Sequence, residues 1–512
     1  MKLNYKRTLF VGFAFFLICA FWQAYDTIVP KILTDRFGMS QFWSGAIMAI
    51  DNILALFLLP LFGILSDKTK SKLGRRTPFI IVGTLIAAVA LISLSFVDSM
   101  QLDRLGNITD INSEEARATL YDYSYSSTIY SPDNKEIIFT EEILDPNIEA
   151  NKDKIAIGRE AFITCSDEDD NYTNCVVPVR SAYIAQEIVG KDPSTLIIFI
   201  AVLFVLLLSM ATFRTPAVAL MPDVTPRPLR SKANAVINLM GTIGGSLILG
   251  LGIVLATGAT KNTYMPYTGY FCIVAGIMLV SLIIFLSTVR ERRFVAEMEE
   301  ISRENNIVEG NDEDEASGSR KLSASEKVSL VLLLASVVLW FFGYNAVTSK
   351  YSVYAGRVLE LDYNSTLLVA NIAALIAYLP VGFIASKFGR KKTIMAGVIM
   401  LSGAFLTASF LDAGTPLPVM MILFAIAGIG WATINVNSFP MVVELARGGN
   451  VGKYTGFYYT ASMAAQTLTP VVSGYLMDSF GLKILFPYAA IFAAGAFITM
   501  LFVRHGDSKP TK

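Results

Sequence analysis

The sequence predicts an all-α membrane protein with twelve transmembrane helices in two six-helix pseudo-repeats. Of its 512 residues, 54% are hydrophobic and only 16% are charged, which exceeds what a water-soluble core requires. Apolar runs long enough to cross a bilayer recur along the chain. The formal net charge is zero, but the charges are sorted by segment, so polarity has to be assigned loop by loop.

The first apolar run extends from Thr8 to about Pro30 and is long enough to cross a bilayer. Lys2, Lys6 and Arg7 precede it, and its length favours a membrane helix over a cleaved signal peptide. Because Lys and Arg resist translocation, the short basic loops place both termini in the cytoplasm. Eleven further runs follow, at residues 42–65, 79–97, 194–220, 233–258, 267–289, 328–349, 366–385, 393–411, 417–443, 454–476 and 482–503.

These runs divide the chain into five segments. The fourth, 290–327, is too charged to fold alone, although its first part is compatible with an interfacial helix. The five are helices 1–3 of an N-terminal half (1–97), an extracytoplasmic insert (98–193), helices 4–6 (194–289), a cytoplasmic linker (290–327) and a C-terminal half with helices 7–12 (328–512).

The insert is a large polar segment with about twenty acidic residues against about eight basic ones, a composition that rules out a span. Residues 118–130 and 136–140 are typical of two strands around a turn at 131–134, which predicts a small folded domain. Cys165 and Cys175 are its cysteines. We predict a single disulfide between them, with two free thiols as the alternative.

A short basic loop recurs in the two halves. From Gly63 to Phe79 it reads G-I-L-S-D-K-T-K-S-K-L-G-R-R-T-P-F, and a weaker copy runs from Gly382 to Thr393 as G-F-I-A-S-K-F-G-R-K-K-T. The copies lie about 320 residues apart, each between two apolar runs. Such a duplication predicts a membrane transporter built from two related halves.

The pattern G-x-x-x-D-K/R…G-R-R/K resembles the loop between helices two and three of the major facilitator superfamily. The fuller form S-D…S-K-L-G-R-R-T-P-F-I resembles the branch of plant sucrose–proton symporters and glycoside–pentoside–hexuronide:cation symporters. R-T-P-A-V-A-L-M-P-D and G-I-G-W-A-T-I-N-V-N-S-F-P are similar to that branch's fourth and tenth helices. The resemblance implies alternating access and, at Asp67, an acid that clasps the halves in one conformation. The loop-motif residues are Gly63, Asp67, Gly74, Arg75 and Arg76.

The chain departs from that branch in two respects within its fourth helix, and the second copy of the basic loop departs from the superfamily pattern. The plant proteins place a proton-carrying aspartate in the fourth helix, whereas residues 194–221 contain no acid. Val218 stands where the branch has an arginine, with Arg214 one turn earlier. In the second copy of the loop, Ser386 replaces the acid. The resemblance therefore predicts the fold, but not the coupling mechanism or the substrate.

Charged residues within the predicted spans are candidates for cation coupling, because each costs about 2.5–3.5 kcal/mol to insert. Asp26 and Asp51 are the two acids clearly inside spans, and Arg214 is the one clearly placed base. A desolvated carboxylate can exchange a proton or hold sodium. We rank Asp51 ahead of Asp26; structural hydrogen bonding or ion pairing is the alternative for all three. His505 lies in the C-terminal tail, which excludes an imidazole relay.

Sugar recognition requires aromatic faces for the ring and amide or hydroxyl groups for its hydroxyls. Aromatic side chains are equally often lipid anchors or core residues, so the amides are the stronger candidates. Trp22 and Asp26 share one helix face, as do Trp431 and Asn435. The candidate substrate-binding residues are Trp22, Gln23, Arg214, Asn234, Asn238, Tyr344, Asn345, Asn371, Trp431, Asn435 and Gln466.

The function we predict is cation-coupled symport of a sugar or glycoside across the plasma membrane. Two alternatives remain open: export or carriage of another metabolite, drug or lipid, and a non-transporting receptor that binds a ligand through the insert. We find no nucleotide loop, metal cluster or nucleophile–base arrangement, so we predict no enzyme, cofactor or metal. The predicted partners are a small substrate with its coupling cation, the lipid bilayer and a possible insert ligand, without nucleic acid.

Overall fold

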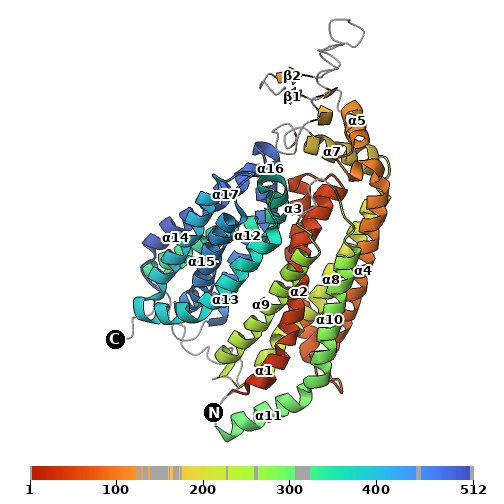
Figure 1. Cartoon of the computed structure of the whole chain (residues 1–512). Coiled ribbons are helices and arrows are strands. Elements are labelled where there is room, and N and C mark those ends of the chain that lie inside the picture. Colours follow the sequence, from red (N-terminus) through yellow and green to blue (C-terminus); the bar gives the residue numbers. More distant parts are fainter. Residues whose placement is uncertain are drawn as a thin grey trace, which may run out of the picture.

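The described part of the chain is almost entirely helical, as the sequence predicts (Figure 1). Cys165 and Cys175 lie outside it, so the disulfide stays a prediction. The computed structural model describes residues 3–123, 128–130, 136–138, 159–160, 162–164, 172, 176–226, 229–258, 263–305, 323–445 and 451–507.

The helices form two bundles, one on each side of the linker. The first contains α1 (Tyr5–Val11), α2 (Phe13–Lys31), α3 (Gln41–Lys68), α4 (Thr77–Leu105), α8 (Ser194–Asp223), α9 (Arg230–Val254) and α10 (Thr268–Thr288). The second contains α12 (Ala324–Tyr354), α13 (Tyr363–Phe388), α14 (Arg390–Ala408), α15 (Leu417–Glu444), α16 (Val451–Phe480) and α17 (Leu485–Phe502). Each bundle buries its own hydrophobic core, so the two halves are separate packing units.

Ten helical stretches in the described residues are long and apolar enough to cross a membrane. They are Tyr5–Arg36, Gln41–Lys68, Thr77–Thr109, Ser194–Asp223, Val236–Val254, Thr268–Thr288, Ala324–Leu359, Arg390–Ala408, Leu417–Val442 and Leu482–Phe502. Two further long helices, α13 and α16, fall outside this set, although both pack within the second bundle. The protein is therefore an integral membrane protein, and the predicted number of twelve spans stays a prediction.

The insert projects from one end of the molecule, and both chain termini lie toward the opposite end (Figure 1). We call these the insert end and the terminal end. In the insert, β1 (Thr128–Tyr130) and β2 (Glu136–Ile138) pair antiparallel, which confirms the predicted hairpin. The start of the predicted first strand is wrong, because α5 (Glu114–Tyr123) covers it. Ser113 Oγ accepts a hydrogen bond from the Ala116 N–H at 3.2 Å and starts this helix.

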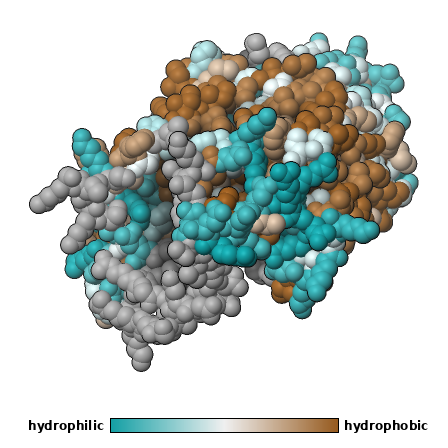
Figure 2. Space-filling model, turned by 90° about the horizontal axis from the view of Figure 1, so that it is seen from below, coloured by the Kyte–Doolittle hydropathy of each residue, from teal (hydrophilic) through white to brown (hydrophobic). Residues whose placement is uncertain are grey.

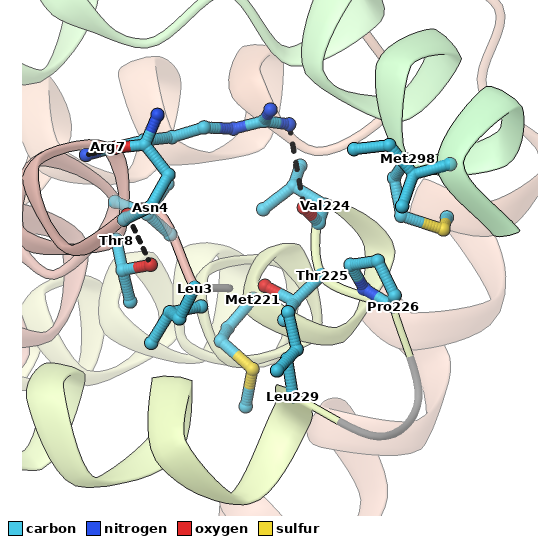
Figure 3. A pocket seen from close by; sticks show the side chains of 12 residues that line it. Leu3, Asn4, Arg7, Thr8, Met221, Val224, Thr225, Pro226, Leu229 and Met298 are labelled. Atoms are coloured by element: carbon cyan, nitrogen blue, oxygen red, sulfur yellow. Dashed lines mark hydrogen bonds between the residues drawn. The ribbon is translucent and has the colours of Figure 1, made fainter. Parts of the chain in front are cut away.

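The first part of the linker forms α11 (Glu291–Glu304), which lies along the terminal end of the first bundle (Figure 1). Arg7 holds it there. Its Nη1 pairs with Glu297 at 3.0 Å, its Nη2 donates to the Phe294 carbonyl at 2.6 Å, and its guanidinium lies 3.8 Å from the centroid of the Phe294 ring. Figure 3 shows Arg7 reaching toward the end of α8, with Met298 of α11 facing the same small pocket.

The two halves are joined at the insert end by charged contacts. Asp35, in the short π-helix Ile32–Arg36 that continues α2, forms an ion pair with Arg357 of the other half at 2.6 Å. The carboxylate of Asp478, near the end of α16, accepts hydrogen bonds from the backbone N–H groups of Gln41 and Phe42 at 2.7 Å each. Asp478 thereby satisfies donors at the N-terminus of α3 from across the interface.

The backbones of α3 and α16 also come into close contact at the insert end. A Cβ atom at Gly45 would lie 2.0 Å from the carbonyl oxygen of Pro470, and one at Gly474 would lie 2.2 Å from that of Gln41. Only glycine permits such an approach. From this contact the two bundles diverge toward the terminal end in Figure 1, so the structure is closed at the insert end.

We expect Asp478→Asn to weaken the closed insert end, because an amide cannot match a carboxylate that accepts two N–H groups. A loss of about 1–2 kcal/mol should raise the fraction of open insert ends roughly tenfold. Double electron–electron resonance between spin labels at the insert ends of α3 and α16 would detect a population with a longer distance between the labels. The control Asp412→Asn, which removes an ion pair with Lys483 within one half, should leave the distances unchanged; an equal shift would contradict the assignment.

Candidate substrate and coupling site

Two adjoining cavities lie between the halves. We call the first, of about 190 Å³, the polar cavity, and the second, of about 360 Å³, the aromatic cavity. Asp26, Asn345 and Thr348 line both, which makes the two cavities neighbours. Of the residues proposed from the sequence, those that line the polar cavity are Trp22, Asp26, Asp51, Arg214, Asn345 and Gln466. The aromatic cavity collects Gln23, Asp26, Tyr344, Asn345, Asn371 and Trp431.

The spacing of residues on α2 explains how one helix serves both cavities. Trp22, Tyr25 and Asp26 follow one another at i, i+3 and i+4, so all three face the polar cavity. Gln23 is turned by about 100° from Trp22 and lines the aromatic cavity instead. Asp26 lies on the boundary between these two faces, which is why it contacts both spaces.

The polar cavity contains two carboxylates, Asp26 and Asp51, and one guanidinium, Arg214. Arg214 stands 5.3 Å from the ring centroid of Trp22 in a cation–π contact, and it forms no ion pair with any described carboxylate. With all three side chains ionised, the group carries one excess negative charge. Charge that is held away from bulk water requires a counter-charge, so the cavity is suited to take up a proton or another cation.

Three hydrogen-bond donors that line the polar cavity lack a partner among the described residues. They are Trp22 Nε1, the Tyr25 hydroxyl and Asn345 Nδ2, and all three atoms are buried. A buried donor without an acceptor is costly. Oxygen atoms of a bound polar molecule would satisfy these groups, which makes the cavity suited to a ligand rich in hydroxyl or carbonyl groups.

The aromatic cavity contains a flat platform contributed by the second bundle. The rings of Tyr344 on α12 and Trp431 on α15 stack in parallel, with centroids 3.6 Å apart and planes within 1°. Phe341 meets the Trp431 ring edge-on at 5.2 Å. Across the cavity, Asn371 Nδ2 donates to Gln23 Oε1 at 3.5 Å and links the halves. An aromatic surface beside two amides can hold a planar or ring-shaped ligand.

Three sequence candidates do not line either cavity. Asn234 and Asn238 are exposed on α9, where Asn238 Nδ2 donates to the Asn234 carbonyl at 2.9 Å. Asn435 is exposed on α15 and hydrogen-bonds Tyr378, which itself lines the aromatic cavity. Helical spacing placed these amides on one face of their helices, but it could not tell which depth along the helix reaches the cavity.

The structure also adds residues that the sequence did not single out. Tyr25, Asn52, Thr348 and Ser349 line the polar cavity, and Tyr378 lines the aromatic one. Tyr25 lies one turn from Trp22 and Asn52 adjoins Asp51, so their positions were the signal that could have revealed them. The hydroxyl groups of Thr348 and Ser349 carry no comparable signal, because such residues are common in membrane helices.

Two buried acids correct the view that Asp26 and Asp51 are alone in the spans. Asp98 is fully buried in α4, which continues past Val97, and it pairs with Arg36 at 3.3 Å. Asp35 lies within the first candidate span and pairs with Arg357. Both acids have a cationic partner, which sets them apart from the acids of the polar cavity.

The basic loop forms a charged cluster within the first bundle. Asp67 pairs with Arg76, and Asp223 binds Arg75 at 2.6 Å and Arg76 at 2.8 Å. Arg76 Nη1 also donates to the Gly63 carbonyl at 3.5 Å. In this conformation Asp67 thus contacts its own loop, and its proposed role between the halves stays a prediction.

Glu291 of α11 is a member of this cluster that sequence reasoning missed. Its carboxylate accepts from the N–H groups of Arg75, Arg76 and Thr77 at 2.7–2.9 Å, which caps the start of α4. Gly74 has a φ of +116°, and a Cβ atom there would lie 2.2 Å from the Glu291 carboxyl carbon. Glycine at this position is therefore required both by the backbone and by the cap.

The sequence matches two protein-family models. The family described as Major Facilitator Superfamily matches residues 181–377 and 365–512, and the family described as MFS/sugar transport protein matches residues 10–102. The chain belongs to the major facilitator superfamily. It is therefore a membrane transporter rather than an enzyme. This assignment agrees with the resemblance carried by the basic loop and by the fourth and tenth helices.

Comparison with single proteins gives a short sequence match and a shared fold. A stretch of 69 residues is 41% identical to the sucrose transport protein SUC3 of Arabidopsis thaliana, covering 14% of this chain and 11% of that protein. A solved D-xylose–proton symporter superimposes with a TM-score of 0.58 at 13% identity, covering 99% of this chain and 100% of the other. The nucleoside transporter NupG gives 0.53 at 13% identity, covering 97% and 100%. These structural likenesses show a common fold.

We expect Arg214→Leu to lower the melting temperature, because it leaves Asp26 and Asp51 in the polar cavity without their nearest cation. Adding Asp51→Asn should recover part of that loss, with a coupling of about 1–3 kcal/mol between the two sites. Thermal unfolding of the two single variants and the double variant in detergent measures the coupling. Strictly additive effects would show that Arg214 and Asp51 do not interact.

Proposed function

We propose that this transporter is a cation-coupled symporter of a sugar or glycoside that works by alternating access with twelve membrane-spanning helices. The observation that carries the proposal is the joining of two unlike cavities at Asp26: one holds acids in excess of bases, and the other holds an aromatic platform beside amides. The excess of acids in the polar cavity favours a bound cation, and the platform and amides of the aromatic cavity favour a polar ring. Alternating access follows from two separate bundles that meet at one end.

We assign cation binding first to Asp51 and communication with the substrate to Asp26. Asp51 lines only the polar cavity, whereas Asp26 lines both cavities and so contacts whatever occupies either one. A proton or a sodium ion on this pair of acids removes the excess negative charge. Arg214 then compensates the remaining carboxylate, and the cavity becomes neutral before it moves through a closed state.

A sugar or glycoside fits the remaining groups. The stacked rings of Tyr344 and Trp431 present an apolar face to the C–H groups of a pyranose or furanose ring. Trp22 Nε1, the Tyr25 hydroxyl and Asn345 Nδ2 offer donors to its hydroxyl oxygens. The aromatic cavity alone falls within the usual range of about 300–1,000 Å³ for small-molecule sites.

We place the protein in the plasma membrane. Its terminal end would face the cytoplasm, because the bases of the loop 63–79 lie at that end. The arrangement with a closed insert end is then the inward-facing one. The insert would lie outside the cell, where it is free to bind a ligand of its own.

A nucleoside is the second candidate substrate. The parallel pair of Tyr344 and Trp431 can stack on a nucleobase as readily as on a sugar face, because both present flat surfaces. The two candidates differ in one respect: a nucleoside places a conjugated ring on the platform and a ribose in the polar cavity. A panel of labelled sugars, glycosides and nucleosides in proteoliposome uptake assays decides between them, and uptake of none of these compounds would refute both.

We expect Asp51→Asn to abolish accumulation of substrate driven by a proton or sodium gradient while the protein still folds. The variant should still exchange labelled for unlabelled substrate, because the aromatic cavity is intact. The control Asp103→Asn alters an exposed acid of α4 outside both cavities and should accumulate substrate normally. Full uphill uptake by Asp51→Asn would refute the assignment of Asp51 to coupling.

A further inference from the structure

A third cavity, of about 800 Å³, lies at the terminal end and shares no lining residue with the polar and aromatic cavities. Its walls come from the basic loop, the end of α8 and the first turns of α11. Figure 2, which views the molecule from below relative to Figure 1, shows hydrophilic residues gathered at this end and a hydrophobic surface beyond them. The cavity is thus a polar space next to the apolar outer surface of the bundle.

Three cationic side chains in this cavity are exposed and form no ion pair with a described residue: Lys70 and Lys72 of the loop, and Arg292 of α11. The acids beside them are largely occupied. Asp223 binds Arg75 and Arg76, as described above. Glu291 is occupied by the backbone cap of α4, and Thr77 Oγ1 donates to it as well at 2.6 Å.

Among the described residues of the cavity wall, Glu299 is therefore the one acid whose carboxylate forms neither an ion pair nor a hydrogen bond. The walls hold four bases, Lys70, Lys72, Arg75 and Arg292, and three acids, so the cavity has an excess of one positive charge, and three of its bases are free to bind an anion. Arg292 supplies a planar fork of donors and the two lysines supply point charges, a combination typical of sites that hold a phosphate group.

The surroundings indicate how such a phosphate would arrive. Val82 of α4 is 51% exposed and Ile283 of α10 is 65% exposed, and both lie within about two helical turns of the cavity along their helices. Leu73, at the tip of the basic loop, is 52% exposed although it is apolar. Because α4 and α10 belong to candidate membrane spans, their exposed apolar groups are expected to face lipid chains, which would put the cavity at the edge of the bilayer.

We propose that this cavity binds the phosphate-bearing headgroup of an anionic lipid, with Lys70, Lys72 and Arg292 holding the phosphate and Leu73 lying among the acyl chains. The site is independent of the transported substrate. It joins the basic loop to α11, and both belong to the first bundle, so a bound lipid stabilises the capped start of α4. Each base near a membrane surface contributes about 1 kcal/mol to the binding of an anionic lipid.

Full-length protein in detergent provides the first test, with three probes: dioctanoyl phosphatidylglycerol, dioctanoyl phosphatidylcholine and inorganic phosphate. We expect the phosphatidylglycerol to raise the melting temperature in a saturable way, because a ligand of the folded state stabilises it by mass action. The zwitterionic lipid should have little effect. If inorganic phosphate stabilises the protein equally well, the source is a soluble anion and the lipid assignment is overturned. No saturable effect of any probe overturns the site itself.

Two triple variants with the same change in charge test whether the three bases of the cavity hold the lipid. Lys70→Gln, Lys72→Gln and Arg292→Gln together should weaken phosphatidylglycerol binding on the order of 100-fold. The control set Lys68→Gln, Arg303→Gln and Lys392→Gln removes the same charge from exposed bases that do not line the cavity, and it should change binding by less than about threefold. Equal losses in both sets would show non-specific attraction and overturn the proposal. Should the triple variant fail to fold, Arg292→Gln alone is measured, with a roughly fivefold loss expected.

Discussion

Compensation of buried charge is the constraint on which the rest of this structure depends. At the insert end, Asp35 pairs with Arg357 and Arg36 pairs with Asp98, so these charges are held in matched pairs. In the polar cavity the same matching is incomplete, because Arg214 stands among two carboxylates and pairs with neither. The paired charges hold the insert end together in this conformation, whereas the centre of the molecule keeps one more carboxylate than guanidinium.

The two regions impose opposite demands during alternating access. In the proposed alternating access, opening the insert end would separate Asp35 from Arg357, and breaking a largely buried pair costs up to about 3–5 kcal/mol unless water or new partners replace the contact. That cost has to be offset by contacts formed at the terminal end, where Asp67 and Arg76 now bind each other within one half. The conformational equilibrium therefore depends on charges at both ends and on the occupancy of the cavities between them.

Sequence patterns predicted what local physics determines and missed what distant contacts determine. Apolar runs and basic loops predicted the helices, and the i, i+4 spacing placed Trp22 and Asp26 on one face. The segment predicted as a strand from Ala118 is a helix instead, because Ser113 caps it and a cap is a local feature that strand patterns do not contain. Glu291 was missed because the N–H groups it caps lie more than 200 positions earlier in the chain, and no periodicity connects them.

Asp26 explains how coupling can occur without a long pathway between two separate sites. In the proposed mechanism, a cation on the acid pair and a ring on the platform would both touch this one side chain, since Asp26 lines both cavities. Each ligand therefore changes the surroundings of the other, and the change in affinity must be the same in both directions. Obligatory symport further requires that the half-loaded protein cannot reorient. An uncompensated carboxylate at the junction of the two halves would meet this requirement, because closing the cavity over it would be unfavourable until a cation is bound.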